Sequence, residues 1–200
     1  MGRSKALLTV PSGDMTFVAR LAATLLDGGV DDALVVGRPD DRALRDEIDR
    51  LTTPVRFVPN HNADSGQLSS VLAGLNAADH PGTSAILVTP VDLPLLRAAT
   101  VSTLLVAFRT GAASIARATH GGKHGHPVIF GRGVFDALRR ADPATGAKSV
   151  VRSQPVLDVE VADAGVLHDV DTPDDYQRLF TGDHEPRREP SQEIERSRET

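Results

Sequence analysis

Hydrophobic and polar positions along the chain repeat with two periods, one typical of helices and one typical of strands. Apolar residues recur at helical spacing over residues 16–27, and Gly28 and Gly29 follow them as a stop. The same pattern predicts helices at 40–51, 67–78, 98–109, 133–140, 147–152 and 173–180. Short apolar runs predict strands that end at Gly37 and strands at 55–58, 84–89, 112–117, 127–130 and 156–161. Residues 6–10 fit a strand or the edge of a loop.

Strands that alternate with helices predict βαβ units and an α/β fold, with a mostly parallel sheet between helical layers. The run at 84–89 is almost entirely apolar, as expected for a strand covered on both faces. Residues 119–126 are polar and glycine-rich, which predicts a loop. From Thr181 onward half of the residues are charged and the only sizeable apolar residue is Ile194. We therefore expect one domain over residues 1–180 and a disordered charged tail over 181–200.

Composition narrows the classes of function. The 200 residues carry a net charge of −5 and a pI near 5.8, which argues against a nucleic-acid-binding surface. The chain has no cysteine, so disulfides and thiolate metal sites are excluded and a reducing, cytoplasmic location is expected. No apolar run approaches 18 residues, so no membrane-spanning helix is expected, and the first residues do not resemble a signal peptide.

Two aspartates are candidates for a metal site. Ligands of an open parallel sheet bind beyond the carboxyl ends of its strands, and SAILVTPVDLPLL puts Asp92 just past such an end. The second acidic segment is HDVDTPDDY, in which Asp171 precedes a predicted helix. Mg²⁺ needs only one or two protein carboxylates when substrate phosphates supply further oxygens. The alternative is that Asp92, Asp171 or Thr172 caps a helix or shapes a turn.

Other polar segments have two or more interpretations. Lys5 would neutralise phosphate charge or would be an ordinary solvated cation. The histidines of residues 119–126 suggest a metal site, a substrate loop or a plain surface turn, and their spacing matches no zinc pattern. The polar run at 60–70 lies where a strand passes into a helix. Its backbone donors would hold an anion or would simply cap that helix.

The order of six motifs resembles the MobA-like nucleotidyltransferase family, and within it the molybdenum cofactor cytidylyltransferases. MGRSKALL resembles the end of the family's glycine-rich opening signature, and NADSGQLSSVLAGL its Asn…Gly…Ser stretch at a helix start. LVTPVDLPLL resembles its apolar strand followed by Asp-x-Pro, and HGHPVIF its Gly-His-Pro segment. DPATGAKSVV and DVDTPDDY resemble its two late signatures. The resemblance covers about nine-tenths of the chain.

The resemblance implies a three-layer, doubly wound, Rossmann-like nucleotidyltransferase fold and roles for individual residues. Asp92 would be the principal Mg²⁺ ligand and Asp171 the second, with Asp169 as the alternative to Asp171. The nucleotide-binding residues would be Gly2, Arg3, Lys5, Asn62, Gly66, Ser69 and Ser70, with Lys5 also catalytic. The acceptor side would hold Gly125, His126 and Pro127.

One departure from the family lies at the start of the sequence. Family members begin with a strand and most of a glycine-rich loop before the Met-Gly that is Met1–Gly2 here. Without that strand, we expect two neighbouring strand edges and part of the core to be exposed. Our hypothesis is that the start codon has been assigned too late and that the natural chain is longer. The alternative is a truncated, inactive relative.

The implied reaction is transfer of CMP from CTP to molybdopterin, with Mg²⁺ as cofactor and release of pyrophosphate. A guanylyltransferase that uses GTP, on the same pterin or another phosphorylated metabolite, is the close alternative. A non-catalytic nucleotide-binding or partner module is a rival from another class. Partners other than nucleotide and acceptor would be a molybdoenzyme or a second copy of the chain, and neither nucleic acid nor membrane is expected.

Overall fold

The computed structural model describes residues 4–11, 13 and 15–181. The α-helices are α1 (Phe17–Asp27), α2 (Arg42–Arg50), α3 (Gln67–Ala78), α4 (Ala98–Thr110), α5 (Phe135–Arg139), α6 (Ala147–Ser153) and α7 (Pro173–Thr181). The strands are β1 (Ala33–Gly37), β2 (Val55–Pro59), β3 (Ala85–Val88), β4 (Ile115–His120), β5 (Lys123–Gly131) and β6 (Val156–Glu160). Four short 3-10 helices are η1 (Lys5–Leu7), η2 (Ala63–Ser65), η3 (Arg132–Val134) and η4 (Ala164–Val166). The predicted α/β class is confirmed.

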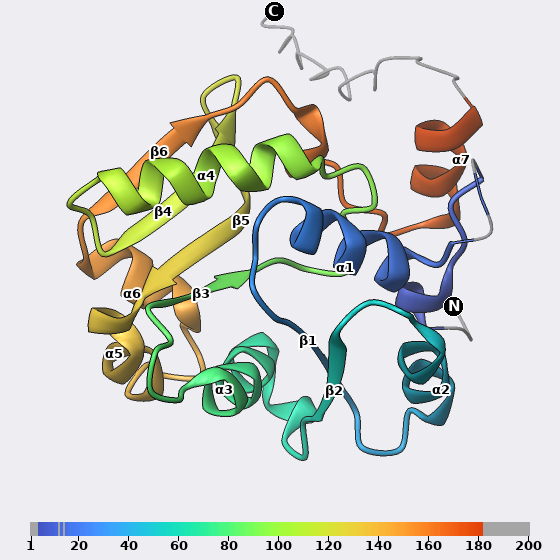
Figure 1. Ribbon diagram of the computed structural model, residues 1–200, viewed down its shortest axis with the longest axis horizontal. Coiled ribbons are helices and arrows are strands. Elements are labelled where there is room, and N and C mark those ends of the chain that lie inside the picture. Colours follow the sequence, from blue (N-terminus) through green and yellow to red (C-terminus); the bar gives the residue numbers. More distant parts are fainter. Residues whose placement is uncertain (1–3, 12, 14, 182–200) are drawn as a thin grey trace, which may run out of the picture.

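The strands form two groups, which Figure 1 shows apart from one another. One group is a four-stranded sheet in the order β3-β5-β4-β6, in which β4 and β6 are parallel and β5 is antiparallel to both of its neighbours. Strands β3, β4 and β6 therefore all run in one direction. The other group is the parallel pair β1 and β2. The four-stranded sheet is therefore mixed, with one reversed strand, and the β1–β2 pair is parallel.

Local sequence signals account for the first two long helices. The Thr16 hydroxyl accepts a hydrogen bond of 3.3 Å from the Ala19 backbone N–H, which caps α1. The Asp41 carboxylate accepts one of 3.0 Å from Leu44 and caps α2. The apolar side of α1 is buried, and α2 buries Leu44 and Ile48 while its charged residues face outward. Capping and amphipathic spacing thus place these helices where the sequence predicts them.

The structure corrects two predicted elements. Residues 119–126, predicted as a loop, belong to the ends of β4 and β5 and the turn between them. Gly121 and Gly122, with φ of +57° and +73°, make a two-residue hairpin turn that only glycine adopts without strain. Residues 6–10, predicted as a strand or loop edge, instead contain the end of η1 and a single bridge from Thr9 to Thr16.

Strands β1 and β3 belong to different sheets and do not pair with each other. Among the described residues, β1 pairs only with β2 and β3 pairs only with β5, so each keeps one unpaired edge. All four residues of β3 are partly exposed, which corrects the prediction that both faces of this strand are covered. The expected exposure of two strand edges is confirmed. A cavity of about 660 Å³ lies between them.

The last helix, α7, packs against the first segment of the domain. Tyr176, Leu179 and Phe180 of α7 pack on Val10 and Phe17. The Tyr176 hydroxyl also donates a 2.6 Å hydrogen bond to the Thr9 carbonyl. In Figure 1, α7 lies beside the blue start of the chain. Of the predicted tail, residues 182–200 lie outside the described part. None of the helices in the described ranges is long and apolar enough to cross a membrane.

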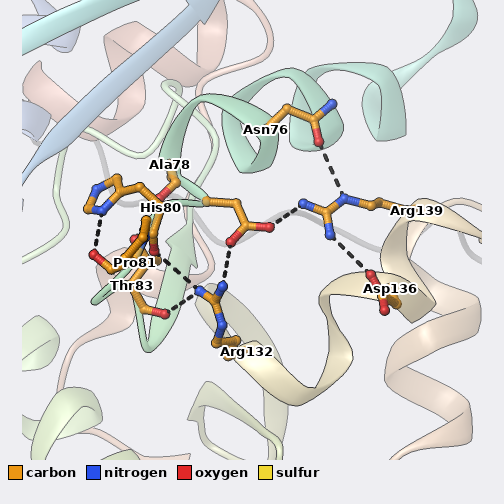
Figure 2. Close-up of polar contacts among 9 residues, drawn as sticks. Asn76, Ala78, His80, Pro81, Thr83, Arg132, Asp136 and Arg139 are labelled. Atoms are coloured by element: carbon orange, nitrogen blue, oxygen red, sulfur yellow. Dashed lines mark hydrogen bonds and ion pairs between the residues drawn. The ribbon is translucent and has the colours of Figure 1, made fainter.

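A network of charges holds the loop before β3. The Asp79 carboxylate receives Arg132 at 3.0 Å and Arg139 at 2.5 Å, and Arg139 also contacts Asp136 (Figure 2). Arg132 further donates to the carbonyl of Thr83 at 2.8 Å. The network thereby joins the end of α3 to η3 and α5, and it fixes residues 80–83 at the amino end of β3.

Candidate active site

Asp92 lies in the turn that follows the carboxyl end of β3. The neighbouring Leu93 and Pro94 are buried, and the Asp92 side chain is 20 % exposed. Its backbone carbonyl accepts a 2.9 Å hydrogen bond from the N–H of Val170, which is itself fully buried. This bond fixes the segment that carries Asp171 against the segment that carries Asp92. Two carboxylates far apart in the sequence are thereby brought to one place.

Lys5 joins these two carboxylates. Its ammonium nitrogen lies 3.5 Å from Asp92 Oδ2 and 2.5 Å from Asp171 Oδ1. Partial burial opposes the Lys5 charge, but the hydrogen bond to Asp171 and the attraction of both carboxylates outweigh it, so the pKa of Lys5 is raised. The same hydrogen bond and charge lower the pKa of the Asp171 carboxyl. Lys5 and Asp171 are therefore both charged at neutral pH.

The helix-capping alternatives for Asp92 and Asp171 do not hold. The Thr172 hydroxyl accepts a hydrogen bond of 3.1 Å from the Asp175 N–H, so Thr172 begins α7. The start of α4 is held by Asp163, whose Oδ2 accepts from the Arg97 N–H at 3.1 Å and from the Thr100 hydroxyl at 2.6 Å. Asp92 and Asp171 thus direct their carboxylates at a cation and not at a helix end.

The carboxylate pair fits a divalent cation in its donor chemistry. Both groups supply the oxygen ligands that Mg²⁺ and Mn²⁺ take, and together they already coordinate one positive charge on Lys5. Asp169 lies beside Asp171 and would add a further oxygen. Within the described ranges, no cluster of three or more His, Asp or Glu side chains has the geometry of a metal cage. Such a site would need oxygens from a substrate to complete the coordination.

The predicted nucleotide stretch surrounds the start of α3. Gly66, at φ +87°, precedes the helix, and no side chain caps the helix N-terminus. Asn60 is 3 % exposed and donates to the Ser69 hydroxyl at 2.8 Å and the Ser70 hydroxyl at 3.0 Å. Its side-chain oxygen accepts from the Asn62 N–H at 2.9 Å. The uncapped helix start is a place where an anion would be stabilised.

These two regions share one cavity. Gln67 and Ser70 of α3 line the same cavity as residues 89–91, which immediately precede Asp92. The structure therefore brings the start of α3 and the carboxyl end of β3 to a common space. Of the other predicted nucleotide-binding residues, Gly2 and Arg3 lie outside the described residues.

The predicted acceptor residues lie on β5, in the strand that pairs with β3. A Cβ on Gly125 would come within 2.3 Å of the Val166 carbonyl oxygen, so this position is filled by backbone packing. His126 is half-buried, and its Nδ1 has no hydrogen-bond partner. Burial lowers the pKa of His126. A hydrogen bond from the imidazole to the Val88 backbone and the attraction of Asp92 and Asp169 oppose this lowering. The imidazole is therefore neutral at pH 7. Pro127 follows through a cis peptide bond.

Asn60, the first residue of the polar run at 60–70, follows β2 directly and orients Ser69 and Ser70. Two further residues near the site were not among the predicted site residues. Asp163 fixes α4 against η4 and has no local sequence signature. Lys148, exposed on α6, adds a positive charge near His126. Its place in the Gly-Ala-Lys motif of α6 would have suggested it.

The fold and the carboxylate pair define the class as an α/β domain of the nucleotidyltransferase type. Residues 1–159 match the MobA-like NTP transferase domain family, and the chain belongs to that family. The resemblance stated from the motifs is thereby confirmed, and the enzyme class is a nucleotidyltransferase of the MobA-like family.

Several known proteins are similar to the chain. Nicotine blue oxidoreductase of Paenarthrobacter nicotinovorans is 34 % identical over 189 residues, which cover 90 % of each chain. Rv0371c of Mycobacterium tuberculosis H37Rv is 28 % identical, with a TM-score of 0.75 over 90 % of this chain and 91 % of that one. A second structure of Rv0371c is a complex with manganese, with a TM-score of 0.72. Molybdopterin-guanine dinucleotide biosynthesis protein A of Archaeoglobus fulgidus is 15 % identical, with a TM-score of 0.65 over 90 % of each chain, and shows likeness of fold alone.

Proposed function

We propose that this protein transfers CMP from CTP to a phosphorylated acceptor, molybdopterin, in a reaction that depends on Mg²⁺. The observation that carries the proposal is the convergence of Asp92 and Asp171 on one cationic position beside Lys5. Membership of the MobA-like family and the manganese complex of a relative support the use of a nucleoside triphosphate and a divalent cation.

The reaction needs little covalent chemistry from the protein. A terminal phosphate oxygen of the acceptor attacks the α-phosphorus of the nucleotide, and the bond from that phosphorus to the bridging oxygen breaks. Pyrophosphate leaves with the electron pair. A divalent cation, when bound, neutralises charge on the reacting phosphates. The remaining task of the chain is to position both substrates and to supply positive charge.

Individual residues divide this task. Asp92 and Asp171 would hold the cation, and Lys5, once released from Asp171, would donate hydrogen bonds to the leaving phosphates. The first turn of α3, with Ser69 and Ser70 oriented by Asn60, would bind nucleotide oxygens. His126, half-buried on β5, would lie on the acceptor side of the site. Guanylyl transfer with GTP uses the same residues and differs only in the contacts to the base.

A second candidate function rests on one observation. A relative that is 34 % identical over 90 % of the chain is a nicotine blue oxidoreductase. A fold that binds nucleotides also accommodates a dinucleotide, so reduction of a coloured heterocycle at this site is the alternative that we test alongside transfer. Under this alternative, Asp92 and Asp171 would have no role that depends on a metal.

The decisive experiment measures two activities and one binding signal on the same preparation. Thermal unfolding is followed with Mg²⁺ and CTP, GTP or ATP, and pyrophosphate release is followed with molybdopterin as acceptor. Oxidation of NADH and NADPH is measured with a quinoid dye. Stabilisation by CTP together with pyrophosphate release supports the proposal, and a preference for GTP moves the assignment to guanylyl transfer. Dye-dependent NAD(P)H oxidation without pyrophosphate release would establish the second candidate. Nucleotide binding with neither activity would identify a binding module.

A further inference from the structure

The proposed mechanism leaves one buried carboxylate, that of Asp163, without a task. Its side chain is 4 % exposed and lies between the end of β6 and η4. Oδ1 accepts a 3.0 Å hydrogen bond from the Gly165 N–H, and Oδ2 accepts from the Arg97 N–H at 3.1 Å and from the Thr100 hydroxyl at 2.6 Å. A carboxylate at this depth is costly to desolvate unless its oxygens accept hydrogen bonds, and here both of them do. The three bonds tie η4 to the start of α4.

The bonds of Asp163 belong to a longer contact between two segments of the chain. We call residues 92–97, which run from Asp92 to the start of α4, the first segment, and residues 163–171, which lead toward α7, the second segment. Three pairs of residues join the first segment to the second: Asp92 with Val170, Leu95 with Gly165, and Arg97 with Asp163. The number rises along one segment as it falls along the other. The two segments therefore lie side by side in opposite directions.

The middle of the second segment has no room to slide. A Cβ on Gly165 would lie 2.5 Å from the Leu95 carbonyl oxygen, so the two backbones are in direct contact there. On another side of η4, a Cβ on Gly125 of β5 would lie 2.3 Å from the Val166 carbonyl oxygen. Closely packed groups of this kind resist small displacements, because any shift breaks contacts on one side and creates overlap on the other. The position of η4 therefore determines where the rest of the second segment lies.

The far end of the second segment carries Asp171, whose place in the site cannot come from its own packing. The Asp171 side chain is 59 % exposed, whereas that of Asp92 is 20 % exposed. Asp171 is held beside Lys5 by an ion pair at the surface, and exposed ion pairs contribute little to the position of a chain. The backbone must therefore bring Asp171 to the site. The bond from the Val170 N–H to the Asp92 carbonyl, 2.9 Å long, is its nearest fixed point.

We propose that Asp163 is the positioning residue of this site. By binding the start of α4 it sets the register of the second segment against the first, and this register brings the Asp171 carboxylate beside Lys5 and Asp92. Asp163 acts through Asp171 and contacts none of the site groups itself. Its effect on a bound metal ion rests on the proposed function, whereas its effect on the register does not.

A simpler role for Asp163 is to cap α4 and nothing more. Arg97 occupies the cap position of this helix and its own side chain makes no capping hydrogen bond, so Asp163 does supply the missing acceptor. A cap alone would stabilise α4 without affecting residues seven or eight positions further along the second segment. The two roles therefore differ in what happens at Val170 and Asp171 when the Asp163 carboxylate is removed.

The first measurement needs no metal. Amide hydrogen exchange of Val170 is compared with that of Ile129, a fully buried residue in the middle of the four-stranded sheet. In Asp163→Ala, exchange at Val170 should become faster by about tenfold or more relative to Ile129, because the second segment is released locally. Thr100→Val removes one of the three donors to Asp163 and should produce a smaller change in the same direction.

The matched control is Leu138→Ala. Leu138 is fully buried on α5, and its core cluster contains no residue of either segment. The substitution lowers the unfolding temperature by creating a cavity, so exchange at Val170 and Ile129 should rise together. This control separates a general loss of stability from release of the second segment.

The second measurement is Mn²⁺ binding, followed by electron paramagnetic resonance. Asp163→Ala should raise the Mn²⁺ dissociation constant by about tenfold, as is typical when a group that orients a metal ligand is lost. In an Asp171→Asn background the same substitution should change Mn²⁺ affinity by less than about twofold, because the residue through which it acts is already gone. The decrease in unfolding temperature should be the same in both backgrounds. Leu138→Ala should leave Mn²⁺ affinity unaltered.

The outcomes separate this inference from the proposed function. Exchange at Val170 that follows Ile129 in both Asp163→Ala and Thr100→Val overturns the inference, and if Asp163→Ala does not fold, Thr100→Val decides alone. An equal loss of Mn²⁺ affinity with and without Asp171 also overturns it, because Asp163 would then act by another route. A parent chain that binds no Mn²⁺ contradicts the proposed function instead, and the exchange at Val170 then decides on the register.

Discussion

The ammonium of Lys5 and the carboxylate of Asp171 are separated by 2.5 Å in space and by 166 residues in sequence. Asp92 Oδ2 lies 3.5 Å from the same ammonium. A single positive charge therefore offsets the repulsion between two carboxylates that the fold holds together. A divalent cation that binds this pair must compete with Lys5 for the same oxygens, and this competition gives Lys5 an effect that is measurable without turnover.

Replacing Lys5 by Met should tighten the binding of Mn²⁺ to the free protein by about fivefold, because a competing charge is removed from the carboxylates. Nucleotidyl transfer should fall in the same variant, because the leaving phosphates lose a cationic partner. Mn²⁺ binding is measured by electron paramagnetic resonance titration. Lys123→Met, on the exposed β4–β5 hairpin, is the matched control. Weaker or unchanged Mn²⁺ binding in Lys5→Met would show that the carboxylate pair is not the metal site.

Asp92→Asn should lower the rate of transfer by about 10²-fold or more, since one of two metal ligands is lost at the reacting phosphates. Mn²⁺ affinity should decrease with it, while the unfolding temperature stays close to that of the parent. Asp158→Asn serves as the control because Asp158 pairs with Arg117 on the surface. Near-normal turnover by a folded Asp92→Asn variant would show that Asp92 is not a metal ligand in the reaction.

Gly125→Ala should lower the free energy of unfolding by about 1–3 kcal/mol. The added methyl group would lie 2.3 Å from the Val166 carbonyl oxygen, so the backbone of β5 or η4 must move. Gly133→Ala is the control, because a Cβ at Gly133 meets no atom within 4 Å. Urea unfolding of the two variants should therefore separate them. Equal stabilities would mean that the strand and η4 pack less closely than described.

Asn60→Ala should lower the free energy of unfolding by about 1–3 kcal/mol and weaken nucleotide binding, because the hydroxyls of Ser69 and Ser70 lose their buried donor. Asn76→Ala provides the comparison, since Asn76 makes a single long contact of 3.4 Å to Arg139. Calorimetric titration with CTP and Mg²⁺ measures the second effect. Unaltered CTP affinity in Asn60→Ala would exclude the start of α3 from the nucleotide site.

The Asp79 network predicts a pH dependence of stability. The hydrogen bond from Arg139 is the main cause that lowers the pKa of the Asp79 carboxyl, and the charge of Arg132 adds to it. A carboxyl whose pKa is lowered in the folded protein raises the free energy of unfolding. This contribution is fully present above the ordinary pKa of the carboxyl, near 3.8. That contribution is lost as the pH falls through the lower folded value.

Asp79→Asn should therefore be less stable than the parent at pH 7, and its stability should fall less between about pH 5 and pH 2. Chemical unfolding across this range measures the difference. Asp27→Asn, at an exposed position at the end of α1, is the matched control. Parallel profiles for Asp79→Asn and the parent would show that the two arginines do not stabilise the folded state through Asp79.

Elements with complete local signals were predicted from the sequence. The helix over residues 17–27 has its cap at Thr16, its apolar face and its glycine stop within one short segment. The placement of Asp92 also followed from a local pattern, an apolar strand followed by a turn with two prolines. Asp171 was a candidate from its acidic segment, but no short-range pattern shows that the Val170 N–H binds the Asp92 carbonyl and so brings the two aspartates together.

Features that depend on distant parts of the chain were not predicted. Residues 119–126, at the tip of the β4–β5 hairpin, were predicted as a loop because they are polar and the turn is made of glycines. The apolar sequence of β3 indicated complete burial. The burial of a strand depends on its neighbours, and among the described residues β3 pairs with β5 alone. Asp163, almost fully buried, binds a helix start more than sixty positions earlier, which sequence spacing cannot reveal.

The ion pair between Lys5 and Asp171 also determines when the site forms during folding. Lys5, Asp92 and Asp171 come from the beginning, middle and end of the domain. Lys5 and Asp171 are 166 residues apart, one of the largest sequence separations among the contacts of the described residues. Long-range contacts form late in folding, because the entropy of closing a large loop must be overcome first. A chain emerging from the ribosome acquires its first helices early, whereas Lys5 has no partner at Asp171 until synthesis has passed α7. We therefore expect the active site to be among the last parts of the described domain to fold.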